Sequence, residues 1–207
     1  MSVRGDPYRW ASLFPDNWVP EALRLICDTW REFRKPSDDE TEPSITARLG
    51  AALDSRNRHN DDFPVMILTE QNALGNVPGQ IDLCFCAGRR PEVYFGFEAK
   101  KLNTRSGDGW ASKADAYTSK EGMGRFISGK YSPEQKHAGM LGYVMDGDCP
   151  RAIACIGEKI ADRRAELQMN PDTNLQQSQL VEDENVLATQ HEIHQRPLTI
   201  HHLFLAA

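Results

Sequence analysis

The stretch YFGFEAKKL, residues 94–102, decides how the rest of the chain is interpreted. It begins with aromatic and apolar residues and ends with charged ones. Alternation along a β-strand places Glu98 and Lys100 on one face, with Phe97 and Ala99 on the other. The charges indicate either a strand that leaves the core and becomes solvated, or a strand that carries a catalytic edge. The surrounding sequence has to separate these interpretations, because short motifs often occur by chance.

The composition is that of an ordinary globular protein. The chain has 207 residues, of which 40% are hydrophobic and 26% are charged, enough for one domain with a sizeable core. No apolar run approaches the roughly 20 residues that span a bilayer, and the first residues lack the apolar core of a secretory signal. Five cysteines without framework spacing agree with a reducing compartment. We therefore expect a cytoplasmic protein with no membrane association, in which Cys84 and Cys86 are buried as small hydrophobes.

The charge is unevenly distributed. The net charge of -6 argues against a generally basic coat for nucleic acid. Between Lys100 and Lys136, however, eight basic residues stand against four acidic ones. This local excess either offers phosphate a place to bind or is a solvated face of an acidic protein.

Two helices are expected before residue 60. Pro20 suits the first turn of a helix over 20–33, and Thr41 can cap a second helix over 42–58. Each helix presents an apolar stripe to the core, made by Leu23, Ile26, Trp30 and Phe33 in the first and by Ile45, Leu49 and Leu53 in the second.

Three strands are expected next, at 64–71, 80–87 and 93–100, separated by turn-forming residues. The short connections predict a meander of antiparallel neighbours. Their nearly continuous apolar character predicts a sheet that helices cover on both faces. Further along the chain, we expect a helix over 111–123, a strand within 139–148 and a helix over 151–168. The predicted fold class is α/β, with a mixed central sheet and the element order α-β-β-β-α-β.

The chain is expected to form a single domain. Its core covers about 40–168, preceded by an N-terminal helical extension over 1–39. Residues 169–185 are polar and are predicted to form a surface excursion. Residues 186–207 are predicted to be a C-terminal strand segment.

Asp82 changes the meaning of the charged strand end. It lies inside the expected strand 80–87, and a carboxylate among apolar residues must be paired or bound, because an isolated buried charge is very costly. If this strand and the next are neighbours, Asp82, Glu98 and Lys100 come together. Two carboxylates and a backbone carbonyl make an oxygen site for Mg²⁺. A lysine beside them can activate water or stabilise the charge that develops on a phosphate.

With this pattern, the sequence resembles the PD-(D/E)XK nuclease superfamily, which has a restriction-endonuclease-like fold. The resemblance covers roughly 40–146 and rests on GQIDLCF followed by YFGFEAKKL. Asp82 matches the first acid of the motif, Glu98 the second acid and Lys100 the lysine. Ile81 stands where the motif has proline, which is a common departure.

Members of the superfamily often add a glutamate from the helix before the meander. Glu42 is the candidate here, and Glu70, near the end of the first strand, is the alternative extra acid. Gln80 is interpreted as a polar residue at the start of a strand. The tripeptide EQK at Glu134–Lys136 also fits Glu-x-Lys, but no expected strand precedes it.

The resemblance implies a metal-dependent endonuclease that hydrolyses phosphodiester bonds in DNA, in restriction, repair or anti-phage defence. It implies Mg²⁺ bound by Asp82, Glu98 and Glu42, with Mn²⁺ as a substitute. RNA stays open as a substrate, since no stacking platform is recognised in the sequence. Many such nucleases work as homodimers or with partner subunits of a multi-gene system. The alternative is a non-catalytic nucleic-acid-binding or assembly subunit that retains the fold.

Two further groups of residues are considered for binding. Arg125, Lys130 and Tyr131 are predicted to contact nucleic-acid phosphates, although their segment could equally pack as a loop. The histidines near the end of the chain are interpreted as structural, because strand alternation separates two of them and no cysteine lies near; they are His191, His194, His201 and His202.

Overall fold

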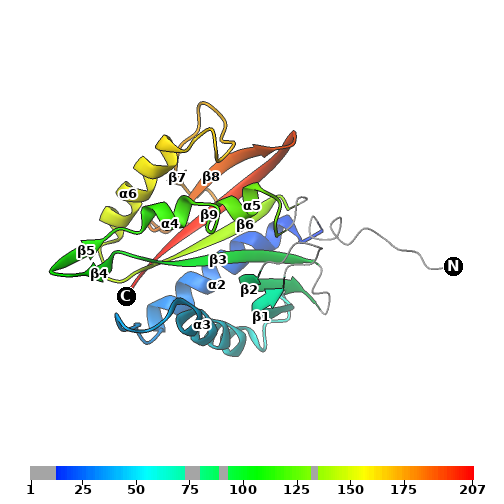
Figure 1. Ribbon diagram of the computed structural model, residues 1–207. Helices are drawn as coiled ribbons and strands as arrows, with labels where there is room; N and C mark the ends of the chain where they lie inside the picture. The colour runs from blue at the N-terminus through cyan, green and yellow to red at the C-terminus, as the bar shows by residue number, and fades with distance from the viewer. Residues whose placement is uncertain (1–12, 73–79, 89–92, 132–134) are drawn as a thin grey trace.

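A sheet of seven strands runs through the protein, with helices on both faces (Figure 1). The computed structural model describes residues 13–72, 80–88, 93–131 and 135–207. The strand order is β1-β2-β3-β6-β9-β8-β7, with parallel pairing of β6 to both of its neighbours and antiparallel pairing elsewhere. The predicted α/β class with a mixed central sheet is therefore confirmed. Among the helices in the described ranges, none has the length and apolar character that crossing a membrane requires.

One face of the sheet is covered by the two helices that the sequence predicts near its start. The Thr41 hydroxyl accepts a hydrogen bond from the Ser44 N–H and so caps the second helix, as expected. Their apolar stripes pack against Phe85 and Phe97 of the sheet. The elements are η1 (Asp16–Trp18), α2 (Val19–Glu32) and α3 (Glu42–Asn57).

The predicted meander forms the first half of the sheet, and a parallel strand extends it. Cys84 and Cys86 lie buried on the middle strand, as predicted. A small separate hairpin, β4 with β5, follows the meander. These strands are β1 (Val65–Asn72), β2 (Gln80–Ala87), β3 (Tyr94–Leu102), β4 (Thr104–Ser106), β5 (Gly109–Ala111) and β6 (His137–Val144).

The second half of the sheet departs from expectation. The segment 186–207, expected as one strand segment, folds as a hairpin whose turn holds His194 and Gln195 at positive φ. The expected surface excursion 169–185 contributes a short edge strand and buries Val181. The segment therefore covers the sheet edge. The strands are β7 (Gln176–Gln177), β8 (Val186–Ile193) and β9 (Arg196–Ala206).

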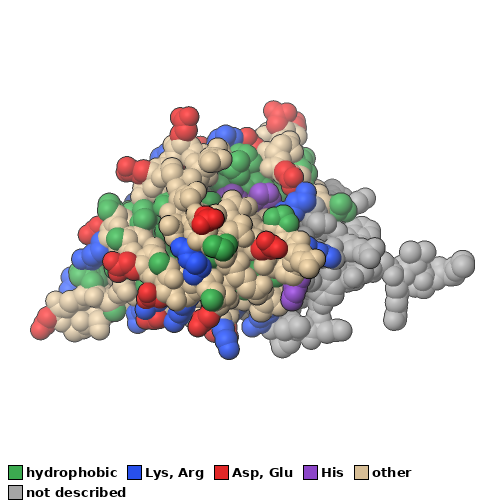
Figure 2. Space-filling view, turned by 90° about the horizontal axis from the view of Figure 1, so that it is seen from above, with side chains coloured by type: hydrophobic (Ala, Val, Ile, Leu, Met, Phe, Trp, Pro, Cys, Tyr) green, Lys and Arg blue, Asp and Glu red, His purple; other side chains and the backbone are tan. Residues whose placement is uncertain are grey.

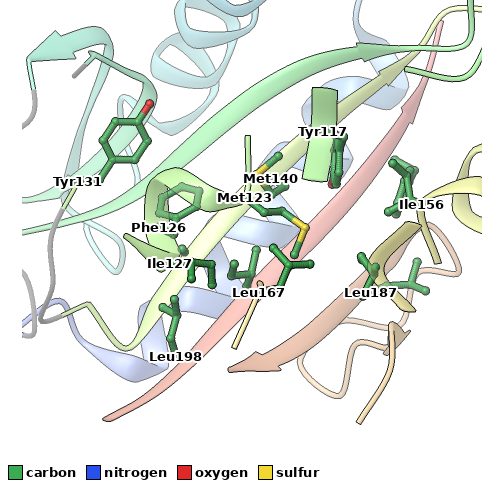
Figure 3. Packing of buried hydrophobic residues seen from close by; sticks show 14 of the residues in the cluster. Tyr117, Met123, Phe126, Ile127, Tyr131, Met140, Ile156, Leu167, Leu187 and Leu198 are labelled. Carbon is green, nitrogen blue, oxygen red and sulfur yellow. The ribbon is translucent and has the colours of Figure 1, made fainter. Parts of the chain in front are cut away.

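Three helices cover the opposite face, over a core of Tyr117, Met123, Phe126, Ile156 and other apolar side chains (Figure 3). The helix expected over 111–123 is shorter: it begins after Lys113, which has a φ of 59°, and ends at Thr118, where Ser119 is extended. A tight turn follows, in which a Cβ at Gly122 would lie 2.1 Å from the Tyr117 carbonyl oxygen. The helix expected over 151–168 also ends early. The helices are α4 (Ala114–Thr118), α5 (Gly124–Ile127) and α6 (Cys149–Asp162).

Candidate active site

The candidate site lies where β2 and β3 stop pairing. Their register runs from Cys86–Tyr94 to Leu83–Phe97. Further along β3, the backbone N–H groups that face β2 need other acceptors. The Asp82 carboxylate accepts from the Ala99 N–H at 2.7 Å, and the Glu42 carboxylate accepts from the Lys101 N–H at 2.7 Å. Two acidic side chains, one from β2 and one from the first turn of α3, therefore replace the missing strand partner.

The Lys100 ammonium lies among the oxygens of this gap. Its Nζ is 2.5 Å from Glu98 Oε1, 2.8 Å from the Ala99 carbonyl oxygen and 3.4 Å from Glu42 Oε1. The Glu98 side chain is 1% exposed and the Lys100 side chain 15% exposed. Glu98 and Lys100 thus meet as alternation along the strand predicts, and Asp82 and Glu42 join them.

The second oxygen of Glu98 is held by two residues from the segment after α4. The Tyr131 hydroxyl donates to Glu98 Oε2, and Arg125 Nη1 lies 3.4 Å from the same oxygen. The Gln80 carbonyl oxygen lies 3.2 Å from Nη1, which donates to it, and 2.6 Å from the hydroxyl, whose single proton it shares as an alternative acceptor to Glu98. The other terminal nitrogen of the Arg125 guanidinium, Nη2, pairs with Glu121 Oε2 at 2.8 Å. We call Arg125 and Tyr131 the Glu98 clamp.

The Glu98 clamp bears on the prediction that Arg125 and Tyr131 contact phosphates. Arg125 is 19% exposed and pairs with both Glu98 and Glu121, so its phosphate contact stays a prediction. Tyr131 is buried beside Phe126 (Figure 3). A buried ring cannot offer itself to a nucleic-acid backbone. The sequence carries no signal for the contact between Tyr131 and Glu98, because Tyr131 lies outside any periodic segment and far along the chain from Glu98.

Burial dominates the electrostatics of the site. Burial, followed by the nearby Asp82 charge, raises the pKa of Glu98 to about 7, although Lys100 acts in the opposite direction. Burial also raises the pKa of Asp82. For Lys100, burial disfavours the charge, but the attraction of Glu98 and Glu42 outweighs it and the pKa rises above its usual value. Burial therefore disfavours the ionised form of both carboxylates, and a nearby cation would favour it.

The oxygens present fit a hard divalent cation. Asp82, Glu98 and the Ala99 carbonyl provide the two carboxylates and one carbonyl expected for Mg²⁺, an ion that keeps several waters when protein ligands are few. Across the described ranges, no three His, Cys, Asp or Glu side chains form a ready-made ligand cluster. Glu42, the third predicted ligand, accepts from the Lys100 ammonium and the Lys101 N–H, just as Glu98 and the Ala99 carbonyl accept from Lys100 and Asp82 accepts from the Ala99 N–H.

The other predicted residues lie outside this arrangement. Glu70 is exposed at φ 53°, and in the described part of the chain it makes no side-chain contact with the site. Lys130 lines a groove of about 750 Å³ together with Lys120. On the face covered by α4, α5 and α6, basic and acidic side chains are interspersed and do not gather into one basic patch (Figure 2). Glu134 lies outside the described residues.

Three of the C-terminal histidines, His191, His201 and His202, are buried, which agrees with the structural role predicted for them, whereas His194 is exposed in the turn between β8 and β9. His201 stacks on His137, while His202 faces the opposite side of the sheet and contacts the Tyr117 hydroxyl at 3.0 Å. His191 is buried, with its ring nitrogens near the Thr189 hydroxyl and the Leu167 carbonyl oxygen, each at 2.7 Å.

Comparisons with family models, curated proteins and solved structures found no match for this chain. The functional argument therefore rests on the chemistry of the site.

Proposed function

We propose that the protein is a metal-dependent nuclease with a restriction-endonuclease-like fold that hydrolyses phosphodiester bonds in DNA. One observation carries the proposal: Asp82, Glu98 and Lys100 meet where β2 and β3 separate, beside the Ala99 carbonyl. The element order α3-β1-β2-β3-α4-β6 also agrees with the order expected for such nucleases.

Each residue of the site has a role that follows from its contacts. Asp82, Glu98 and the Ala99 carbonyl would hold Mg²⁺, which when bound supplies positive charge to the phosphate that is attacked. The Lys100 ammonium is placed to orient a water molecule or to stabilise the negative charge that develops on the phosphate oxygens. Glu42 keeps Lys100 charged and in place.

The role of the Glu98 clamp is to fix the orientation of the Glu98 carboxylate, which in this proposal binds the metal. A carboxylate that binds a metal needs its other contacts defined, since these contacts set its orientation and basicity. Tyr131 and Arg125 hold one oxygen of Glu98 and leave the other facing Lys100.

A second candidate function is nucleic-acid binding or assembly without catalysis. The observation in its favour is that both Glu98 oxygens already contact protein donors. Donors on both oxygens of a buried carboxylate stabilise a fold without any metal.

Nicking of supercoiled plasmid by the purified protein distinguishes the two functions. We expect nicking with Mg²⁺ or Mn²⁺ and none with chelator. Glu98→Gln is the matched control, because it keeps the shape of the side chain and removes the charge. Binding of plasmid without nicking under all metal conditions would favour the second function, and single-stranded DNA and RNA assayed in parallel define the substrate.

A further inference from the structure

The β4–β5 hairpin projects from the end of the strand that carries the site (Figure 1). It forms a two-stranded sheet separate from the main one, with Arg105 directly opposite Trp110. Gly107 begins its two-residue turn at φ 58°, the conformation that favours glycine in tight hairpins. A hairpin of this size buries too little to be stable alone, so its base must hold it in place.

The base of the hairpin is firmly attached. Asn103 is 1% exposed, and its backbone N–H donates to the Ser112 carbonyl oxygen at 3.2 Å, which closes the hairpin. Its side-chain amide donates to Asp146 at 2.9 Å. The hairpin therefore extends β3 as a defined arm.

The arm carries an exposed aromatic plate. Trp110 is 40% exposed, and among the described residues only Leu13 is another large hydrophobic residue with such exposure. The Arg105 guanidinium lies 5.3 Å from the Trp110 ring centroid. Arg105 Nε pairs with Asp38 at 3.2 Å, while its Nη nitrogens bond to no residue that the structure describes. The pair thus presents one aromatic ring together with free guanidinium donors.

The surroundings of the plate favour a base over a protein surface. The rest of the hairpin consists of Thr, Ser, Gly, Asp and Ala residues, so Trp110 is its only large apolar side chain. A large apolar patch typical of a protein-binding surface is therefore not present on the hairpin, whereas one nucleic-acid base needs only one ring to stack on. A guanidinium beside the ring adds attraction to both bases and phosphates.

The plate also lies within reach of a strand bound at the site. Arg105 is five positions after Lys100 in the sequence, which is at most about 18 Å of extended chain. Stacked nucleotides rise by about 3.4 Å each. A strand held at Lys100 would therefore reach the hairpin within about five nucleotides.

We propose that the Trp110–Arg105 plate stacks an unpaired base of the nucleic acid whose backbone lies at the site, a proposal that rests on the proposed nuclease function. The hairpin then fixes the position of single-stranded or locally opened nucleic acid relative to Lys100.

The test measures binding of a fluorescent single-stranded oligonucleotide, as DNA and as RNA of one sequence, in chelator so that no strand is cut. Trp110→Ala should weaken binding about tenfold, within the range for loss of one stacked base. Trp110→Phe should stay within about threefold of wild type for the same reason. The dependence on salt should be unchanged, because no phosphate contact is lost. Thermal melting should also be unchanged, since the side chain is exposed.

Oligonucleotides with a single abasic position supply the decisive comparison. Moved along the strand, the abasic site should weaken wild-type binding at one position and have no effect there in Trp110→Ala. If wild type binds and nicks nucleic acid but Trp110→Ala binds equally well, the stacking proposal is wrong and the nuclease proposal stands. If wild type neither binds nor nicks any nucleic acid, the nuclease proposal fails first.

Discussion

Two groups of buried titratable side chains lie on the same sheet, and the protein treats them differently. At the β2–β3 gap, carboxylates stay beside a partly exposed ammonium and a clamp of Arg125 and Tyr131. Between β8 and β9, the Thr189 hydroxyl bridges the rings of His191, at 2.7 Å, and His202, at 2.9 Å. The series of hydrogen bonds continues from His202 to the Tyr117 hydroxyl. The first group keeps the charged Lys100 beside carboxylates whose pKa values are raised, and the second is hydrogen-bonded without charge.

The pKa values follow this difference. Burial lowers the pKa of His191 to about 4 and that of His202 well below its usual value, so both rings are neutral near pH 7. At the gap, the carboxylates instead share the charge of Lys100 and repel one another. Buried groups that serve only packing can be neutralised by hydrogen bonding. Titratable groups that converge and have shifted pKa values are typical of functional sites.

The largest expected effect concerns Lys100. Lys100→Ala should reduce plasmid cleavage by about 10²-fold or more, because a positive charge aimed at the developing phosphate charge is lost. Mn²⁺ binding, measured on the same preparation, should persist. Activity within a few-fold of wild type would contradict the assigned role.

The control for Lys100→Ala has to be a lysine outside the site. Lys101 is unsuitable, because its Nζ donates to the carbonyl oxygens of Asp38 and Glu40, each at 2.8 Å, and so holds the segment before Glu42. Lys136 forms an exposed pair with Asp16. Lys136→Ala should leave cleavage unchanged, since such surface pairs contribute little.

Asp82→Asn is expected to have a smaller effect than Lys100→Ala, and this effect is measured on the thermal stability of the protein. The amide oxygen can still accept from the Ala99 N–H, while repulsion with Glu98 disappears, so the metal-free variant should be at least as stable as wild type. The stabilisation by Mg²⁺, about 2.7 kcal/mol at a hundred times Kd, should vanish. Thermal melts in chelator and in excess metal measure both quantities. A variant that melts clearly lower in chelator, yet gains as much from metal as wild type, would make Asp82 a merely structural acceptor.

The pH dependence of stability separates the two groups directly. The unfolded chain binds more protons than folded His191 between pH 6.5 and about 4, so this group costs stability as the pH falls. Glu98 acts oppositely: from pH 7 towards 4.5 the folded chain binds the extra proton, so stability is gained. Glu98→Gln removes only the second contribution. Urea unfolding in chelator should show the variant losing more stability than wild type over this range, by on the order of 1 to 3 kcal/mol. Parallel curves for the two proteins would mean that Glu98 titrates normally.

The smallest effect is expected at Lys130. It lines the groove beside α5, and no ion pair joins it to a described residue. Lys130→Ala should weaken DNA binding a few-fold, evenly across sequences, and reduce the slope of log affinity against log salt by about 1. An unchanged slope would place the groove outside the binding surface. Arg125 is unsuitable for this test, since its substitution would disturb Glu98.

Local patterns explain what could be predicted from the sequence. The meander was predictable because three apolar runs are divided by turn-forming residues, and the register then brings Asp82 close to Glu98. Glu42 was predictable only from the resemblance. β8 was missed because VLATQHEI mixes apolar, polar and histidine residues, and its burial depends on pairing with β9. The Glu98 clamp depends on where a loop returns to the sheet, which no periodicity records.

The position of β9 has a consequence for how the protein is made. β9 lies beside β6 in the sheet, although α6, β7 and β8 are synthesised between them. Until β9 emerges, the edge of β6 presents unpaired backbone groups one strand away from Glu98. Pairing between such distant segments is slow. The sheet beside the site is therefore complete only after β9 has been made and has paired with β6.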